Sequence, residues 1–159
     1  MPSLLAVDLG VNCGLALFDK EERLVWQRSQ NFGSVSRLRR AVPSLLRTIP
    51  NLSAIVAEGG GEIAEIWQRQ AERRALPFLL IDASTWRRDL LYEREQRSGI
   101  EAKQNADNLA YKVIRWSNLS PPRELRHDAA EAILVGLWGI MQSDWISKTE
   151  INMYILRNS

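Results

Sequence analysis

The chain has 159 residues, 45% hydrophobic and 25% charged, which is the size and composition of one soluble globular domain with its own core. The formal net charge is only +2. No apolar run reaches the roughly 18 residues that cross a bilayer, so we expect no membrane span. No basic segment precedes an apolar one at the start, so we expect no secretory signal. The single cysteine, Cys13, excludes an internal disulfide and a cysteine-rich zinc site, which favours a cytoplasmic protein.

The first third of the chain predicts three strands and a helix. Apolar runs of strand length lie at 3–9, 13–18 and 23–28. Because the gaps between them are short and polar, we expect antiparallel strands joined by hairpins. The segment 34–49 carries apolar residues at helical spacing, with Ser34 or Ser36 as its N-cap. Pro43 falls inside this segment and is expected to break or kink the helix.

Two strand-helix units follow. The expected elements are a central strand at 52–58, a turn at Gly59–Gly61, a helix at 62–75 and a strand at 77–82. Asp82 or Ser84 then caps a short helix.

The last part of the chain predicts two long helices. The segment 99–116 has a continuous apolar stripe, and a loop with two adjacent prolines separates it from a second helix at about 125–142. The tail, 143–159, shows no clear pattern. Hairpin strands followed by strand-helix units predict an α/β domain over 1–159, with a mixed sheet and helices on both faces.

Four carboxylates stand at the ends of these elements. Asp8 closes the first strand, Glu58 closes the fourth, and the last helix begins with Asp128 and Glu131. Each acid has an ordinary explanation, since Asp-x-Gly is a turn signature, an acid before glycine suits a solvated loop, and acids are favourable at a helix N-terminus.

Their combination is more specific. If the first and fourth strands are neighbours and the last helix crosses their ends, the four acids meet, and they repel one another unless cations neutralise them. Carboxylate oxygens suit two Mg²⁺ ions, with Mn²⁺ as a substitute, and such a pair can support phosphodiester hydrolysis.

Three motifs resemble those of a known family. They are "AVDLGVNCGLAL", "SAIVAEG" and "RHDAAEAILVGL", and their order and spacing are similar to those of the RuvC-type Holliday-junction resolvases of the RNase H-like superfamily. The segment "GIEAKQNADNLAYKVI" resembles the stretch in which that family places a lysine at the start of a helix, here Lys103. The resemblance covers roughly residues 3–142.

The resemblance implies a five-stranded mixed sheet of order 3-2-1-4-5, and Mg²⁺-dependent cleavage of four-way DNA junctions by a homodimer. It implies that the metal ligands are Asp8, Glu58, Asp128 and Glu131, and that Lys103 lies near the scissile phosphate. The chain departs from the family pattern with Leu9 where proline is common, with Glu131 where aspartate is usual, and with glycines where an aromatic residue often follows the second motif.

Arginines gather in two places. One group is Arg37, Arg39, Arg40 and Arg47, and the other is Arg69, Arg73, Arg74, Arg87 and Arg88. Arginine suits phosphate, although such runs are equally typical of solvated helix faces. For contacts with DNA we favour Lys103, Arg69, Arg73, Arg87 and Arg88. Trp86, beside two arginines, is the best candidate for base stacking, and His127 either orients a phosphate or a water or is structural.

Two alternatives stay open. The same fold acts in other branches of the superfamily on RNA or on other branched DNA. A non-catalytic RNase H-like module that binds nucleic acid or protein is the third possibility, and poor Mn²⁺ binding would distinguish it from the two nucleases.

Overall fold

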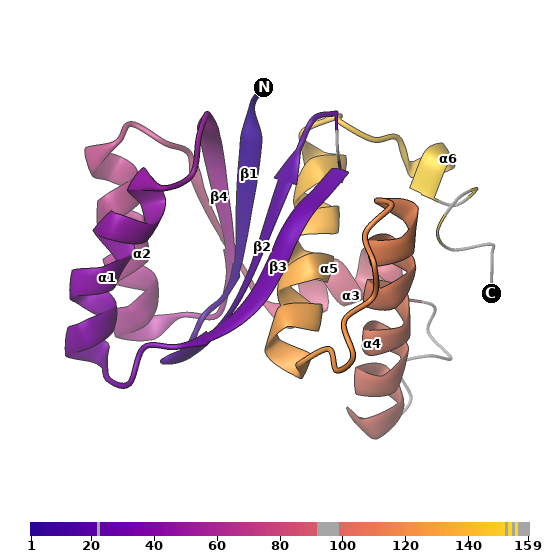
Figure 1. Ribbon diagram of the computed structural model, residues 1–159, viewed down its shortest axis with the longest axis horizontal. Coiled ribbons are helices and arrows are strands. Elements are labelled where there is room, and N and C mark those ends of the chain that lie inside the picture. The colour runs from indigo at the N-terminus through magenta and orange to yellow at the C-terminus, as the bar shows by residue number, and fades with distance from the viewer. Residues whose placement is uncertain (22, 92–98, 152, 154, 156–159) are drawn as a thin grey trace.

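The computed structural model describes residues 1–21, 23–91, 99–151, 153 and 155 (Figure 1). Its strands are β1 (Ser3–Asp8), β2 (Asn12–Asp19), β3 (Arg23–Asn31), β4 (Leu52–Glu58) and β5 (Phe78–Ile81). Its helices are α1 (Val35–Arg47), α2 (Gly61–Arg73), α3 (Ala83–Leu90), α4 (Gly99–Trp116), α5 (His127–Gln142) and α6 (Lys148–Ile151). The short α6 lies in the predicted tail, whose last residues are outside the described part of the chain.

The strands form one mixed sheet of order β3-β2-β1-β4-β5. β1, β2 and β3 are antiparallel neighbours, whereas β4 pairs in parallel with β1, and β5 in parallel with β4. The predicted strand order, hairpins and mixed sheet are therefore confirmed.

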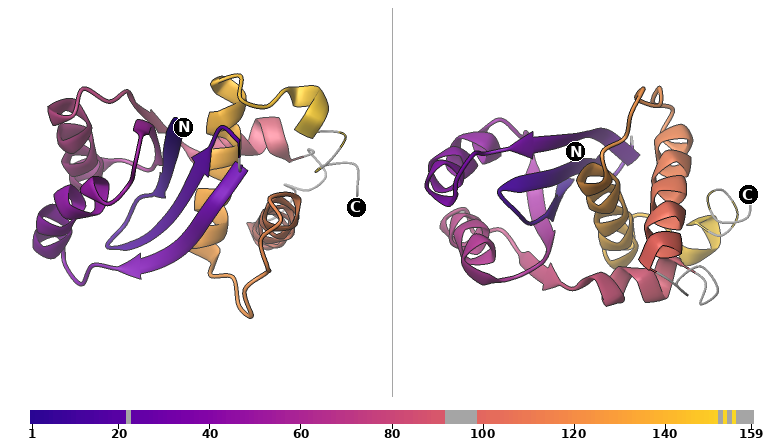
Figure 2. Two further views of the ribbon diagram at one scale, coloured as in Figure 1. Left: turned by 45° about the horizontal axis from the view of Figure 1, so that its top comes forward. Right: turned by 90° about the horizontal axis from the view of Figure 1, so that it is seen from below.

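Both faces of the sheet are covered (Figures 1 and 2). α1 and α2 lie on one face, and α5, with α3 and α4 outside it, lies on the other. In β1, Leu5 and Val7 belong to the core under α1 and α2, whereas Leu4 and Ala6 belong to the core under α5. Burial on both faces explains why the central strands are continuous apolar runs rather than alternating ones.

Helix α5 lies unusually close to the sheet because small residues face each other. Ala129 and Ala130 are buried at its first turn, and Gly14 of β2 lies under the backbone of Asp128. A β-carbon built at Gly14 would overlap the carbonyl of Asp128, and one built at Gly136 would overlap the ring of Phe18. These glycines are thus needed for close approach, and they set the distance of α5 from the end of β1.

One of the two effects expected of Pro43, a break in the helix, was wrong. Pro43 does not break α1, which is helical from Val35 to Arg47 after the Ser34 N-cap. Leu38, Val42 and Leu46 are buried on both sides of the proline. Each such side chain gains about 1.5–3 kcal/mol from burial, which together outweighs the cost of about 3 kcal/mol for an internal proline.

No helix in the described part of the chain is both long and apolar enough to cross a membrane.

Candidate functional site

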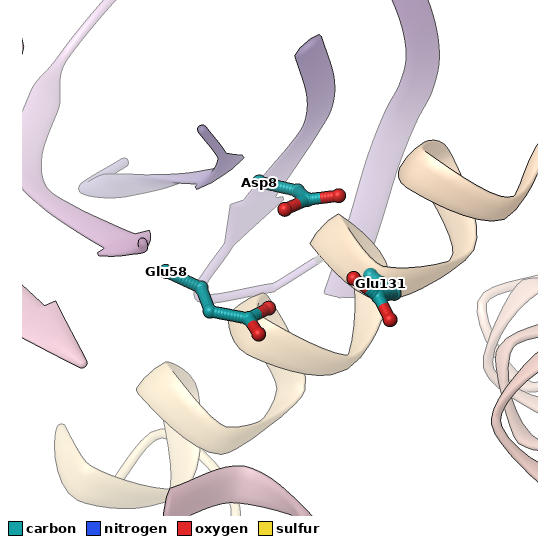
Figure 3. Close-up of side chains that lie close together, drawn as sticks. All are labelled: Asp8, Glu58 and Glu131. Carbon is teal, nitrogen blue, oxygen red and sulfur yellow. The ribbon is translucent and has the colours of Figure 1, made fainter. Parts of the chain in front are cut away.

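The parallel pairing of β1 with β4 sets two carboxylates side by side. Asp8 and Glu58 are register partners at the last position of each strand. Helix α5 crosses this end of the sheet and brings in Glu131 from its second turn. One carboxylate oxygen from each of the three residues lies within 4.8 Å of the others. Figure 3 shows the three side chains pointing into one space from three different elements.

Crowding and burial favour a bound proton at this cluster. Burial raises the pKa of Asp8 to about 8, with further contributions from the charges of Glu131, Glu58 and Asp128 and from a hydrogen bond with Glu131. Burial also raises the pKa of Glu58, and the charge of Glu131 adds to it. The arrangement is therefore unfavourable when every acid is ionised and no cation is present.

Helix α3 holds two of the acids from outside. The indole Nε1 of Trp86 donates to Oε2 of Glu58 at 3.2 Å, and the guanidinium of Arg87 lies 3.6 Å from Oε1 of Glu131. The bond from Trp86 and the charge of Arg87 both lower the pKa of Glu58 and so offset part of its rise. Asp82 caps this helix by accepting from the backbone N–H of Thr85, as one of the two predicted caps.

Trp86 is therefore not a platform for base stacking. Its side chain is completely buried, and its only polar atom is used to hold Glu58. The adjacent arginines suggested a stacking site, but the apolar face of α3 turns the indole into the core.

Asp128 lies beside the three-carboxylate cluster without being part of it. Its Oδ2 accepts from the hydroxyl of Ser29 at 2.8 Å, and its Oδ1 accepts from the N–H of Ala129 at 2.7 Å. Ser29 of β3 is the register partner of Gly14, which in turn pairs with Asp8, so one row across the sheet leads from Asp8 to Asp128. The charge of Asp128 reaches Asp8 and contributes to its raised pKa.

His127 connects Glu131 to helix α4. Its Nε2 is 3.0 Å from Oε1 of Glu131, and its Nδ1 is 3.0 Å from Oδ1 of Asp107. Asp107 was not among the residues that the sequence pattern singled out, since nothing in a single helix indicates which turn faces a distant histidine. Lys103 is exposed one helical turn before Asp107, on the same side of α4.

The arginines expected to contact DNA differ in their environment. Arg87 is half-buried and faces the acids, whereas Arg88 of α3 is exposed. Arg69 and Arg73 are exposed in the second half of α2, toward the end of that helix that is remote from Glu58.

The donor set fits a hard divalent cation. Three carboxylates offer only oxygen ligands, and burial leaves them few other ways to compensate their charge. Mg²⁺ and Mn²⁺ prefer such ligands together with water. Asp8, Glu58 and Glu131 would hold such an ion directly, and Asp128 could join after giving up its bond with Ser29.

The comparisons with known proteins agree with this topology. No protein-family model matches the chain, and no curated protein matches it in sequence. Among solved structures it is similar to T. thermophilus RuvC in complex with a Holliday junction substrate, with a TM-score of 0.62 and 13% identity, covering 91% of this chain and 96% of that one. The chain therefore has the RuvC-like RNase H-like fold that its motifs predicted.

Proposed function

We propose that this protein is a metal-dependent endonuclease that resolves four-way DNA junctions. The observation that carries the proposal is the meeting of Asp8, Glu58 and Glu131 at one end of the sheet, with burial and mutual repulsion raising the pKa of Asp8. The choice of substrate is supported by the fold, since the similar T. thermophilus protein was solved with a Holliday junction.

Two Mg²⁺ ions are the proposed cofactor, with Mn²⁺ as a substitute. Asp8, Glu58, Glu131 and the neighbouring Asp128 would hold them. When bound, such ions activate a water for attack on a phosphodiester and stabilise the oxygen that leaves.

The protein's own groups prepare the site for that charge. Trp86 and Arg87 fix the directions in which Glu58 and Glu131 present their oxygens. We propose that Lys103, exposed on the adjacent helix, neutralises charge that develops at the scissile phosphate, so that Lys103→Ala slows cleavage more than it weakens binding.

The test compares labelled substrates with the wild type and Asp8→Asn. A four-way junction, a linear duplex of the same length and an RNA hairpin are each incubated with and without Mg²⁺. We expect junction cleavage only with the wild type and only with Mg²⁺, little cleavage of the duplex, and unchanged junction binding by Asp8→Asn.

Other results would direct the assignment elsewhere. Cleavage of the RNA hairpin in preference to the junction would indicate an RNA nuclease. A wild type that neither cleaves nor binds Mn²⁺ would indicate a non-catalytic module. Wild-type activity in Asp8→Asn would exclude the proposed site.

A further inference from the structure

The positive charge of the chain is concentrated in one continuous segment. Residues 23–57 contain six arginines and no acidic residue. Because the whole chain has 21 basic and 19 acidic residues, the remainder has 15 basic and 19 acidic ones, a net charge of −4. A near-neutral protein therefore carries a segment of charge +6 that comprises β3, α1 and most of β4.

Helix α1 displays much of this charge on one face. Arg37, Arg40, Ser44 and Arg47 are all exposed, and at 100° per residue they fall within an arc of about 80°. Leu38, Val42 and Leu46 anchor the opposite face in the core. Arg39 projects to another side, where it pairs with Glu62 of α2 at 2.9 Å.

The exposed face of α1 differs from an ordinary solvated helix surface. Such surfaces intersperse both signs of charge, as α2 does with its arginines and glutamates. Within the described residues, Arg37, Arg40 and Arg47 form no ion pair with a carboxylate, and Arg47 instead donates to the hydroxyl of Ser44 at 3.2 Å. Arginines interleaved with a serine hydroxyl are the side chains that proteins use for phosphate oxygens.

Strand β3 extends this surface to the level of the carboxylates, on the face of the sheet that α1 and α2 cover. Arg28 is exposed and stacks over Trp26, with 4.2 Å from the guanidinium carbon to the ring centroid, and Trp26 packs against the core beneath α1 and α2. The next residue, Ser29, points to the opposite face, where it bonds Asp128 in the row of Asp8, so Arg28 lies level with the acids but on the other face of the sheet. Arg28, Arg37, Arg40 and Arg47 are called the arginine surface below.

The arginine surface starts at the end of the sheet that holds the acids. β3 ends at Asn31, and α1 begins four residues later, so Arg37 lies toward that end and Arg47 toward the opposite one (Figure 1). Ten residues of helix separate these two arginines, which corresponds to about 15 Å. That length spans about four phosphates of one DNA strand, at about 3.4 Å of axis per charge.

We propose that the arginine surface binds the phosphate backbone of a duplex DNA arm that leads away from the carboxylate site. The choice of a DNA junction as substrate rests on the proposed function. The choice of surface rests on the positive charge of its arginines, which complements phosphate, and on their position along the sheet. Contacts of this kind carry no sequence information, so they hold the arm and orient it for any junction sequence.

The test removes charge from the surface and measures the salt dependence of binding. Arg40→Gln with Arg47→Gln is compared with Lys20→Gln with Arg115→Gln, which removes the same charge from exposed sites in the β2–β3 turn and on α4. Both pairs are made in an Asp8→Asn background, and binding to a four-way junction is measured at several salt concentrations. Melting temperatures establish that each protein is folded.

The arginine pair should reduce the slope of log affinity against log salt by about 2, because each lost phosphate contact removes about 0.9 from it. At low salt we expect junction affinity to fall about tenfold or more. The control pair should retain the slope of its parent.

Three results would overturn the inference. The arginine pair could show the slope and affinity of the control pair. It could lose affinity for an RNA duplex while keeping its affinity for DNA, which would assign the surface to RNA. It could lose affinity for polyglutamate but for neither nucleic acid, which would assign the surface to an acidic protein. Failure of the proposed function is distinguishable, because the wild type would then not cleave the junction, whatever the salt dependence of the arginine pair.

Discussion

The carboxyl of Asp8 is stabilised in its protonated form by its surroundings in the metal-free protein. Its pKa is raised to about 8 in the folded chain, whereas an unfolded aspartate titrates near 4. The folded state therefore binds more protons than the unfolded state between these pH values. The stability that this group provides is complete below about pH 4 and is lost as the pH rises through about 8.

Asp8→Asn should remove the loss of folding stability that ionisation of Asp8 causes at high pH. In metal-free buffer near pH 8 we expect the variant to be more stable than the wild type by about 2 kcal/mol, or about 4–8 °C in melting temperature. The difference should shrink toward pH 5, and Mg²⁺ should raise the melting temperature of the wild type only. Thermal denaturation from pH 5 to 8.5 provides the measurement, with exposed Glu72→Gln as the control. A wild type that melts no lower at pH 8 than at pH 5 would contradict the predicted repulsion.

His127 is expected to position Glu131 through its link to α4. Its ring contacts Glu131 on one side and Asp107 on the other, each at 3.0 Å. Groups that orient a ligand from behind commonly contribute 10–100-fold to metal affinity. We therefore expect His127→Ala to weaken Mn²⁺ binding about tenfold.

A double-mutant cycle tests whether Asp107 acts on the site through His127. His127→Ala, Asp107→Ala and their combination are compared by calorimetric titration with Mn²⁺. If Asp107 acts through His127, the double variant should bind Mn²⁺ as the His127 variant does, with a coupling energy of about 1 kcal/mol. Additive losses would show that the two residues act separately.

At the scale of the elements, Gly14 sets the distance between the sheet and α5. A side chain there would overlap the carbonyl of Asp128 and push away the helix that carries Glu131. Gly14→Ala should cost at least about 1–3 kcal/mol of stability, as overpacking does in other cores, and should also weaken Mn²⁺ binding.

Gly99→Ala is the matched control, because a β-carbon at that position meets no atom within 4 Å. Urea denaturation and Mn²⁺ titration measure the two effects. A folded Gly14→Ala protein with unchanged Mn²⁺ affinity would show that the helix tolerates displacement without disturbing the site.

Much of this architecture could be predicted from the sequence. Strands that are buried on both faces are continuous apolar runs, and the acids that follow two of these runs mark where the strands end. Asp8 and Glu58 could be expected to meet, since parallel neighbours end at the same edge of the sheet. The side-chain direction of Asp128 could not, because it depends on Ser29, which is 99 residues away. Pro43 misled for a related reason, since tertiary burial outweighed the local preference of the backbone.

At the scale of the whole molecule, the proposed reaction requires two active sites. The chain brings together one carboxylate cluster among its described residues, and such a cluster breaks one strand per event. Resolving a four-way junction needs two cuts at positions related by near two-fold symmetry. We therefore expect a homodimer, whose own two-fold axis presents two identical sites to that substrate.

Mixed dimers test this expectation on a supercoiled plasmid with an extruded cruciform. The wild type and Asp8→Asn are given different affinity tags, co-expressed, and purified through both tags. A wild-type dimer should convert the plasmid to the linear form, because both cuts occur before the cruciform is lost. The mixed dimer should yield nicked circles, because the first cut releases the supercoiling that holds the cruciform open, and no second active site is present to cut in time. A doubly tagged Asp8→Asn dimer should leave the plasmid supercoiled. Light scattering that finds a monomer at micromolar concentration, together with only nicked circles from the wild type, would contradict paired cleavage and leave a nuclease that cuts one strand at a time.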